Sequence, residues 1–81
     1  MAAVQGNASA QTNLAALYAN GDGVEQNYVR AQMWFILSAA SGNENARKNR
    51  DIIAKRMTAQ QISEAEKMVR DCRQIRFNGC D

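Results

Sequence analysis

Apolar residues recur at spacings of three and four along most of the chain, which is the period of an amphipathic α-helix. No stretch alternates between apolar and polar residues as a half-buried strand would, and proline is absent. The pattern therefore predicts an all-α fold of four helices, at residues 8–20, 28–41 and 44–56 and from Thr58 onward. The positions expected on the inner faces of these helices are Ala10, Leu14, Leu17, Tyr18, Ala31, Trp34, Phe35, Ser38, Ala46, Ile53, Met57, Ile62, Ala65, Met68, Val69 and Cys72.

Each predicted helix begins beside a residue that can cap it. Asn7, Asn27 and Asn43 stand where an N-cap side chain would accept a hydrogen bond from the first turn of a helix. Thr58 and Gln61 have the spacing of a capping box, in which the two residues pair reciprocally. These local signals agree with the boundaries that the apolar pattern predicts.

Glycines mark the breaks between the helices. Residues 20–23 read Asn-Gly-Asp-Gly, and glycine adopts the positive φ of a tight turn without steric cost. Gly6 and Gly42 stand where a left-handed residue would end a helix. The loop lacks the alternating acids and the closing glutamate of a calcium-binding loop, so it predicts a turn and not a metal site.

The chain also contains an internal repeat. Residues Ala3–Ala10 align with Ala39–Ala46 at an offset of 36 residues, with a glycine and an asparagine at matching places. A period in the mid-thirties is the length of one helix–turn–helix unit in an α-solenoid. The repeat therefore favours stacked helical hairpins.

The residues of the first unit resemble the Sel-one-like repeat, a relative of the tetratricopeptide repeat. The stretch LAALYANGDGV begins at Leu14, and a tryptophan, an alanine pair and a Gly-Asn pair follow it at helical spacing. The resemblance implies an alpha–alpha superhelix of two antiparallel helical hairpins. Its signature positions in this chain are Ala10, Leu14, Leu17, Tyr18, Gly21, Gly23, Val24, Ala31, Trp34, Ala39, Ala40, Gly42 and Ala46.

The resemblance also divides the chain. One complete repeat is expected at residues 7–42, a degenerate C-terminal capping hairpin at 43–74 and a tail at 75–81. Residues 1–6 are expected to be either the end of a preceding repeat or an added start. The chain would then come from the C-terminal end of a longer array, in which any signal peptide lies upstream. Trp34 is expected to lie wedged between neighbouring helices.

Composition argues against catalysis. The chain of 81 residues contains no histidine, which excludes Ser–His and Cys–His nucleophiles and histidine-ligated metals. Carboxylates such as Glu44 and Glu66 have bases four residues later, Lys48 and Arg70, which is typical of surface ion pairs. We therefore expect no enzyme activity and no cofactor. No apolar run approaches the roughly 20 residues that span a bilayer.

The net charge of +2 is unevenly distributed, since residues 43–81 carry nine bases and six acids. Their signs alternate, which is typical of a solvated helical face. Nucleic-acid binding is therefore not expected, although it stays an alternative. The bases that would carry it are Arg47, Lys48, Arg50, Lys55 and Arg56.

Cys72 and Cys80 are the only cysteines. The residues alone leave two interpretations open, a bridge from the tail to the last helix or two unrelated thiols. The pair resembles the cysteine-rich secreted branch of the Sel-one-like family, in which cysteines at this separation form a disulfide. That resemblance implies a periplasmic or secreted bacterial protein, because disulfides persist in oxidising compartments. Without the bridge, the expected location is the cytoplasm.

The resemblance implies a protein–protein interaction scaffold that binds a protein or peptide along its first-helix face. An alternative from the same resemblance is a secreted protein that binds a small cell-wall-like or β-lactam ligand. A homodimer through the N-terminal edge is also expected. The residues that helix geometry places on the candidate contact surface are Gln11, Thr12, Ala16, Asn20, Lys48, Asn49 and Lys55.

Overall fold

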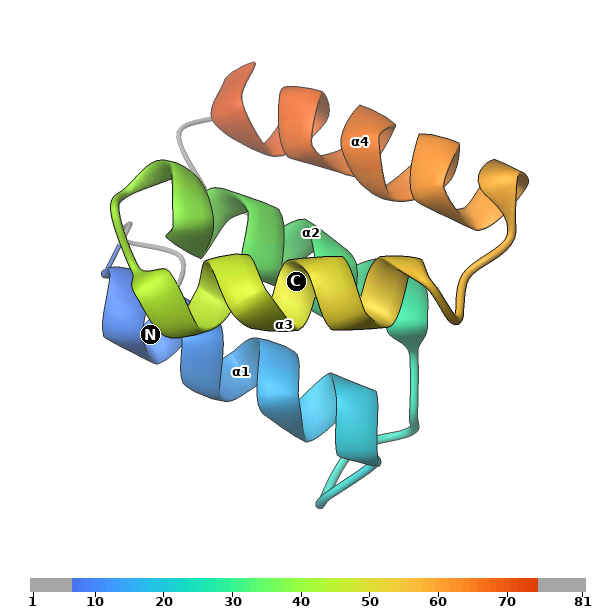
Figure 1. Ribbon diagram of the computed structural model, residues 1–81, viewed down its shortest axis with the longest axis horizontal. Coiled ribbons are helices and arrows are strands. Elements are labelled where there is room, and N and C mark those ends of the chain that lie inside the picture. The colour runs from blue at the N-terminus through green and yellow to red at the C-terminus, as the bar shows by residue number, and fades with distance from the viewer. Residues whose placement is uncertain (1–6, 75–81) are drawn as a thin grey trace.

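The computed structural model describes residues 7–74, which form four helices and no strand. They are α1 (Ala8–Asn20), α2 (Tyr28–Ala40), α3 (Glu44–Ala54) and α4 (Ala59–Gln74). Successive helices run in opposite directions, and α1 and α2 form an antiparallel hairpin (Figure 1). The predicted all-α fold is confirmed. Residues 1–6 and 75–81 lie outside the described residues.

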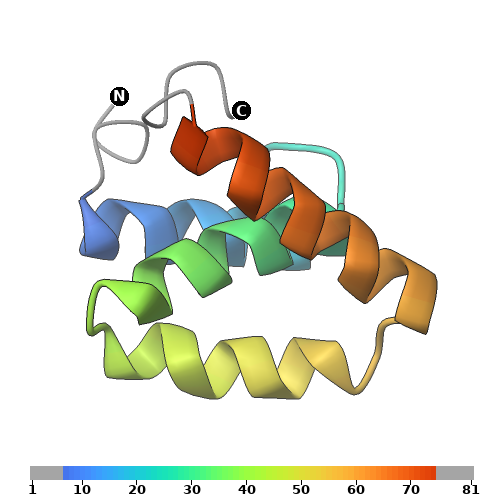
Figure 2. The same cartoon turned by 90° about the horizontal axis from the view of Figure 1, so that it is seen from above.

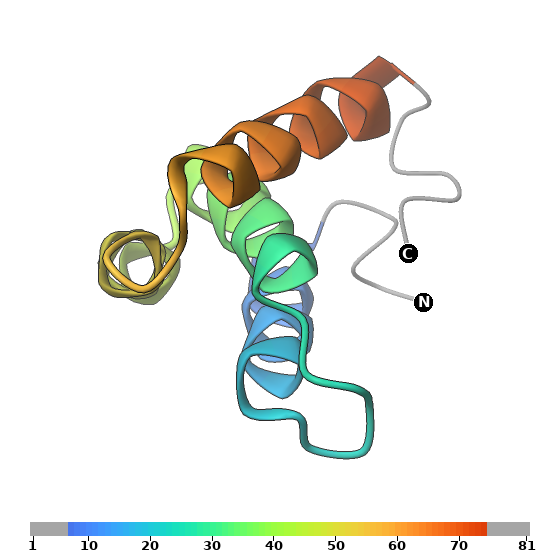
Figure 3. The same cartoon turned by 90° about the vertical axis from the view of Figure 1, so that its right-hand side faces the viewer.

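Helix α2 lies at the centre of the molecule. It packs against α1, α3 and α4, whereas the other helices contact one another little. Figure 3 shows these three helices on different sides of α2, and Figure 2 shows α4 crossing it at an angle. Although α3 and α4 are antiparallel and joined by a short turn, they are therefore held mainly by α2.

The four predicted caps are confirmed. Each side-chain oxygen accepts a hydrogen bond from the backbone N–H three residues later, which satisfies a donor that the first helical turn leaves unpaired. The Thr58 backbone N–H also donates to Gln61 Oε1 at 2.9 Å, which completes the capping box. The cap distances are Asn7 to Ala10 2.9 Å, Asn27 to Arg30 3.0 Å, Asn43 to Ala46 2.9 Å and Thr58 to Gln61 3.1 Å.

Two helices end slightly earlier than predicted. Helix α2 ends at Ala40 instead of residue 41, and α3 ends at Ala54 instead of residue 56. After Ala54 the backbone tightens, since the N–H groups of Arg56 and Met57 donate to carbonyls three residues back, at 2.8 and 3.3 Å. Such i to i−3 bonds commonly close the last turn of an α-helix.

The glycine loop joins α1 to α2 as predicted. Gly21 has a φ of 73° and donates its N–H to the Leu17 carbonyl at 2.8 Å, which ends α1 in the left-handed conformation. Gly23 and Gly42 also have positive φ, of 76° and 95°. The Asn27 N–H then donates to the Tyr18 carbonyl at 2.9 Å, so the loop is held against the end of α1. Gly6 lies outside the described residues.

The core is built around α2. Trp34 is fully buried, as predicted, and its neighbours Met33, Phe35 and Leu37 are at most 2% exposed. Because these side chains point to different sides of α2, they can meet the apolar faces of three helices. The buried apolar partners that the other helices contribute are Leu14, Ala15, Ala46, Ile53, Ala65, Val69 and Cys72, with Met57 from the turn after α3.

The core-facing side of α1 matches the predicted one only in part: Leu14 is buried and Ala10 and Tyr18 pack against the core, but Leu17 does not. The buried residues of α1 are Gln11, Leu14 and Ala15, whereas Leu17 is 40% exposed. The assignment of Leu17 to the inner face was wrong. Alanines lie all round α1, so its apolar face is poorly defined by sequence, and the packing against α2 decides which residues are buried.

Candidate functional site

A groove of about 270 Å³ lies between α1 and α3. Its first wall comes from the second half of α1, through Ala16, Ala19 and Asn20. Tyr28 and Phe35 of α2 also line it, and Phe35 is almost completely buried. Because α1 and α3 both pack on α2 and barely contact each other, their separation leaves this space open.

The second wall of the groove comes from α3 and the turn that follows it. Asn49, Ile52, Ile53 and Arg56 line this side. Ile52 is 53% exposed, which is unusual for a large apolar side chain, whereas Ile53 belongs to the core. Arg56 is exposed and, within residues 7–74, is the only charged residue that lines the groove. The two walls therefore combine amides, apolar surface and one cation.

Three of the predicted contact residues line this groove: Ala16, Asn20 and Asn49. Lys48 of α3 and Lys55, which directly follows α3, are exposed but do not line the groove. Whether any of these residues contacts a partner stays a prediction.

Two other predicted contact residues, Gln11 and Thr12, lie towards the interior of the molecule instead of on its surface. Gln11 is completely buried, so its placement on the contact face was wrong. Thr12 is half-buried, and its hydroxyl lies 2.6 Å from Ser38 Oγ of α2 and donates to the Ala8 carbonyl at 3.0 Å. Ser38 Oγ also donates to the Ala8 carbonyl, at 2.7 Å. These polar contacts join α1 to α2 and explain why this part of α1 faces inward.

Sequence reasoning missed most of the groove. A helical-period step from a predicted residue would have found several positions, because residues three and four apart share a face. Such steps lead from Ala16 to Ala19 and from Asn49 to Ile52 and Ile53. The missed lining residues are Ala19, Tyr28, Phe35, Ile52, Ile53 and Arg56, of which Arg56 was considered only for nucleic-acid binding.

The first hairpin matches a known family. The model of the Sel1 repeat matches residues 8–43, from the first residue of α1 to the N-cap of α3. Residues 8–43 are a Sel1 repeat. Sel1 repeats generally mediate protein–protein interaction. Neither the curated proteins nor the solved structures contain a significant match to the chain.

The structure places the Sel1 signature residues in distinct roles. Trp34 and the small Ala31 are fully buried in the α1–α2 hairpin, and the repeat's glycines have positive φ. Small residues let helix backbones approach, while the large ring fills the space between them. The other signature residues are buried (Leu14, Ala46), half-buried (Ala10, Tyr18, Val24, Ala39) or exposed (Leu17, Ala40). The Sel1 repeat supplies one wall of the groove and its base, and α3 supplies the other wall.

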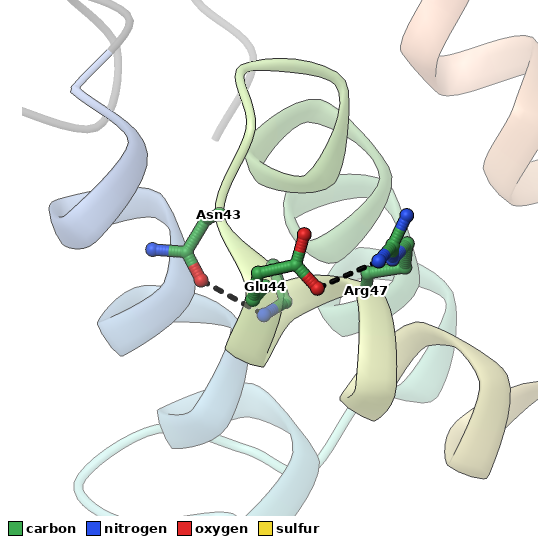
Figure 4. A network of polar contacts seen from close by, with 4 residues as sticks. Asn43, Glu44 and Arg47 are labelled. Atoms are coloured by element: carbon green, nitrogen blue, oxygen red, sulfur yellow. Dashed lines mark hydrogen bonds and ion pairs between the residues drawn. The ribbon is translucent and has the colours of Figure 1, made fainter.

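Helix α3 and the turn after it carry an excess of positive charge beside the groove. Residues 44–56 contain five bases and two acids. Glu44 pairs with Arg47 at 2.7 Å near the helix N-terminus, as Figure 4 shows, and Asp51 pairs with Arg50 at 3.3 Å. Both acids are therefore already paired. Lys48, Lys55 and Arg56 form no ion pair within residues 7–74.

The predicted disulfide involves the end of α4. Cys72 is 2% exposed and belongs to the hydrophobic core. Cys80 lies outside the described residues, so the Cys72–Cys80 bridge stays a prediction, as does the homodimer.

Within residues 7–74, no three His, Cys, Asp or Glu side chains are grouped so that they could hold a metal ion. None of the helices in that range has the length and apolar character needed to cross a membrane.

Proposed function

We propose that this chain is a protein-interaction scaffold that binds an extended segment of a partner protein in the groove between α1 and α3. The observation that supports this most directly is the groove itself, which the Sel1 repeat and α3 build together. Ile52 exposes apolar surface to water beside the buried Phe35 and Ile53. Binding of a partner side chain there would be favourable, because it would remove this apolar surface from water.

The size of the groove favours part of a polymer over a complete small molecule. Its volume of about 270 Å³ is below the roughly 300–1,000 Å³ of pockets that enclose drug-sized ligands. A space of this size accommodates one or two side chains, while the remainder of the bound segment would lie along the groove in solvent.

The polar residues of the groove suit a peptide backbone. Asn20 and Asn49 stand on opposite walls, and each side-chain amide offers both donors and an acceptor. An extended peptide presents N–H and C=O groups to both sides, so each wall can pair with it. Because these pairs involve the backbone, they would add affinity without fixing the partner's sequence.

A random peptide library displayed on phage and selected on the immobilised protein tests this function. Selected peptides are then measured by fluorescence anisotropy against two variants. Ala16→Arg places a long side chain in the groove, and Asn13→Arg places the same side chain on an exposed part of α1 outside it. We expect about a tenfold loss of affinity for Ala16→Arg, roughly 1.4 kcal/mol of binding free energy, and little change for Asn13→Arg.

Three results would contradict the proposed function. The selection could yield no peptide above background, or the selected peptides could bind Ala16→Arg as tightly as the wild-type protein. Turnover of nitrocefin above a protein-free control would instead support the small-ligand alternative, and it would show chemistry that a scaffold does not perform.

A further inference from the structure

The charges around the groove specify the kind of segment that fits it, provided that the proposed function is correct. Among the described residues, the only charged side chain that lines the groove is the cation Arg56. Lys48 of α3 and Lys55, directly after α3, are exposed, and none of the three bases forms an ion pair within residues 7–74. The α3 wall therefore presents positive charge that no described acid neutralises.

None of the acids within residues 7–74 lines the groove. Glu44 and Asp51 of α3 are paired with Arg47 and Arg50. Asp22 and Glu25 lie in the loop between α1 and α2, are exposed and do not line the groove. A carboxylate placed beside Arg56 would therefore meet a cation that no acid within residues 7–74 already pairs with.

We infer that the groove selects an acidic segment of a partner protein, with one apolar side chain over Phe35 and Ile52 and a neighbouring carboxylate at Arg56. The apolar side chain contributes by burying the exposed part of Ile52. The carboxylates contribute through charge complementarity, which accelerates association and excludes partners of the same sign.

The same cations could attract a nucleic-acid backbone, but the lining of the groove favours a peptide. Phe35 is almost completely buried and exposes no ring face for bases to stack on, and Tyr28, the other aromatic lining residue, is half-buried. Ile52 provides aliphatic surface, which suits an aliphatic side chain better than a nucleotide. The groove thus combines one cation with aliphatic surface, instead of a continuous basic track.

Two synthetic peptides test the inference. Both are capped at their ends and carry one leucine. In the first, glutamates flank the leucine, and in the second each glutamate is replaced by glutamine. We expect the acidic peptide to bind the whole chain about tenfold more tightly at low salt, and we expect this advantage to shrink towards physiological ionic strength.

Matched variants locate the binding. Arg56→Gln should weaken the acidic peptide about fivefold and leave the glutamine peptide unchanged, as expected for loss of one exposed charge pair. Arg70→Gln removes the same charge from an exposed position on α4 and should have little effect.

A second pair of variants tests the apolar contact. Ile52→Ser should weaken the binding of both peptides, whereas Leu17→Ser, which removes an exposed leucine outside the groove, should weaken neither. Circular dichroism confirms that each variant is folded.

The outcomes separate this inference from the proposed function. Equal affinity of the two peptides, or equal effects of Arg56→Gln and Arg70→Gln, would overturn the acidic preference while leaving groove binding in place. A second contrary outcome concerns nucleic acid. If single-stranded oligothymidylate bound more tightly than the acidic peptide, and if Arg56→Gln abolished that binding, the acidic-peptide preference would be overturned in favour of nucleic acid. Failure of both peptides together with every peptide of the random library would overturn the proposed function itself.

Discussion

Gly21 and Gly23 share a left-handed backbone but have different surroundings. A Cβ added at Gly21 would lie 3.3 Å from Gln26 Cβ, whereas one added at Gly23 would meet nothing within 4 Å. An L-residue in this conformation costs about 1–2 kcal/mol at either position. Gly21→Ala should therefore lower the free energy of unfolding by more than Gly23→Ala, because it adds a close contact to the same strain. Urea denaturation measures both, and equal losses would show that Gln26 moves aside freely.

Residue by residue, the sequence was most informative where a local rule decides the outcome. The caps at Asn7, Asn27 and Asn43 depend on atoms three residues apart, so they could be predicted without knowing the fold. Trp34 was also predictable, since burying a large ring removes much apolar surface from water. Gln11 and Leu17 were not, because their exposure depends on how α1 is turned against α2.

At the level of elements, α3 depends on its cap more than the other helices do. It is the shortest of the four, and most of its residues are exposed. Asn43→Ala removes the side chain that accepts from the Ala46 N–H (Figure 4) and should cost about 1 kcal/mol of stability. Asn45→Ala is the matched control, because Asn45 is exposed inside the first turn and caps nothing.

Thermal unfolding followed by circular dichroism compares these two variants. A lower midpoint for Asn43→Ala, with Asn45→Ala at or above the wild-type value, is the expected result. If both variants melted together, the cap would contribute nothing and the packing of Ala46 against α2 would account for the position of α3.

The helices themselves were predicted well, and their faces less evenly. In α3 and α4 a few apolar residues stand in a polar background, so Ala46, Ile53, Ala65 and Val69 identify the inner face unambiguously. In α1 the apolar residues are mostly alanines, which change little in free energy between core and surface. Its orientation is instead fixed by tertiary contacts, including the bond from Ser38 to the Ala8 carbonyl.

For the molecule as a whole, the groove was the feature that sequence could not supply. Its walls come from α1 and α3, and its depth depends on the side chains of α2 that lie between them. The sequences of α1 and α3 do not predict the distance between these two helices, because both are positioned by their packing on α2. The chain could thus indicate Asn20 and Asn49 as surface residues but could not show that Phe35 lies beneath them.

The predicted bridge concerns the stability of the entire chain. If Cys72 and Cys80 are joined, reduction should lower the free energy of unfolding by about 2–3 kcal/mol, by the loop-entropy argument. Mass spectrometry after alkylation, with and without prior reduction, determines whether the thiols are free. We propose an oxidising compartment on the condition that the bridge forms. Complete alkylation of protein purified without reductant would contradict both proposals.

The separation of α1 from α3 has a thermodynamic consequence. Because these helices barely contact each other and are held mainly through α2, a bound segment that contacts both walls would add a direct link between them. Ligand that binds only the folded chain stabilises it in proportion to RT ln(1 + [L]/Kd). Binding of the partner would therefore raise the free energy of unfolding of this small domain. The chain would be more resistant to unfolding and to proteolysis in the complex than alone.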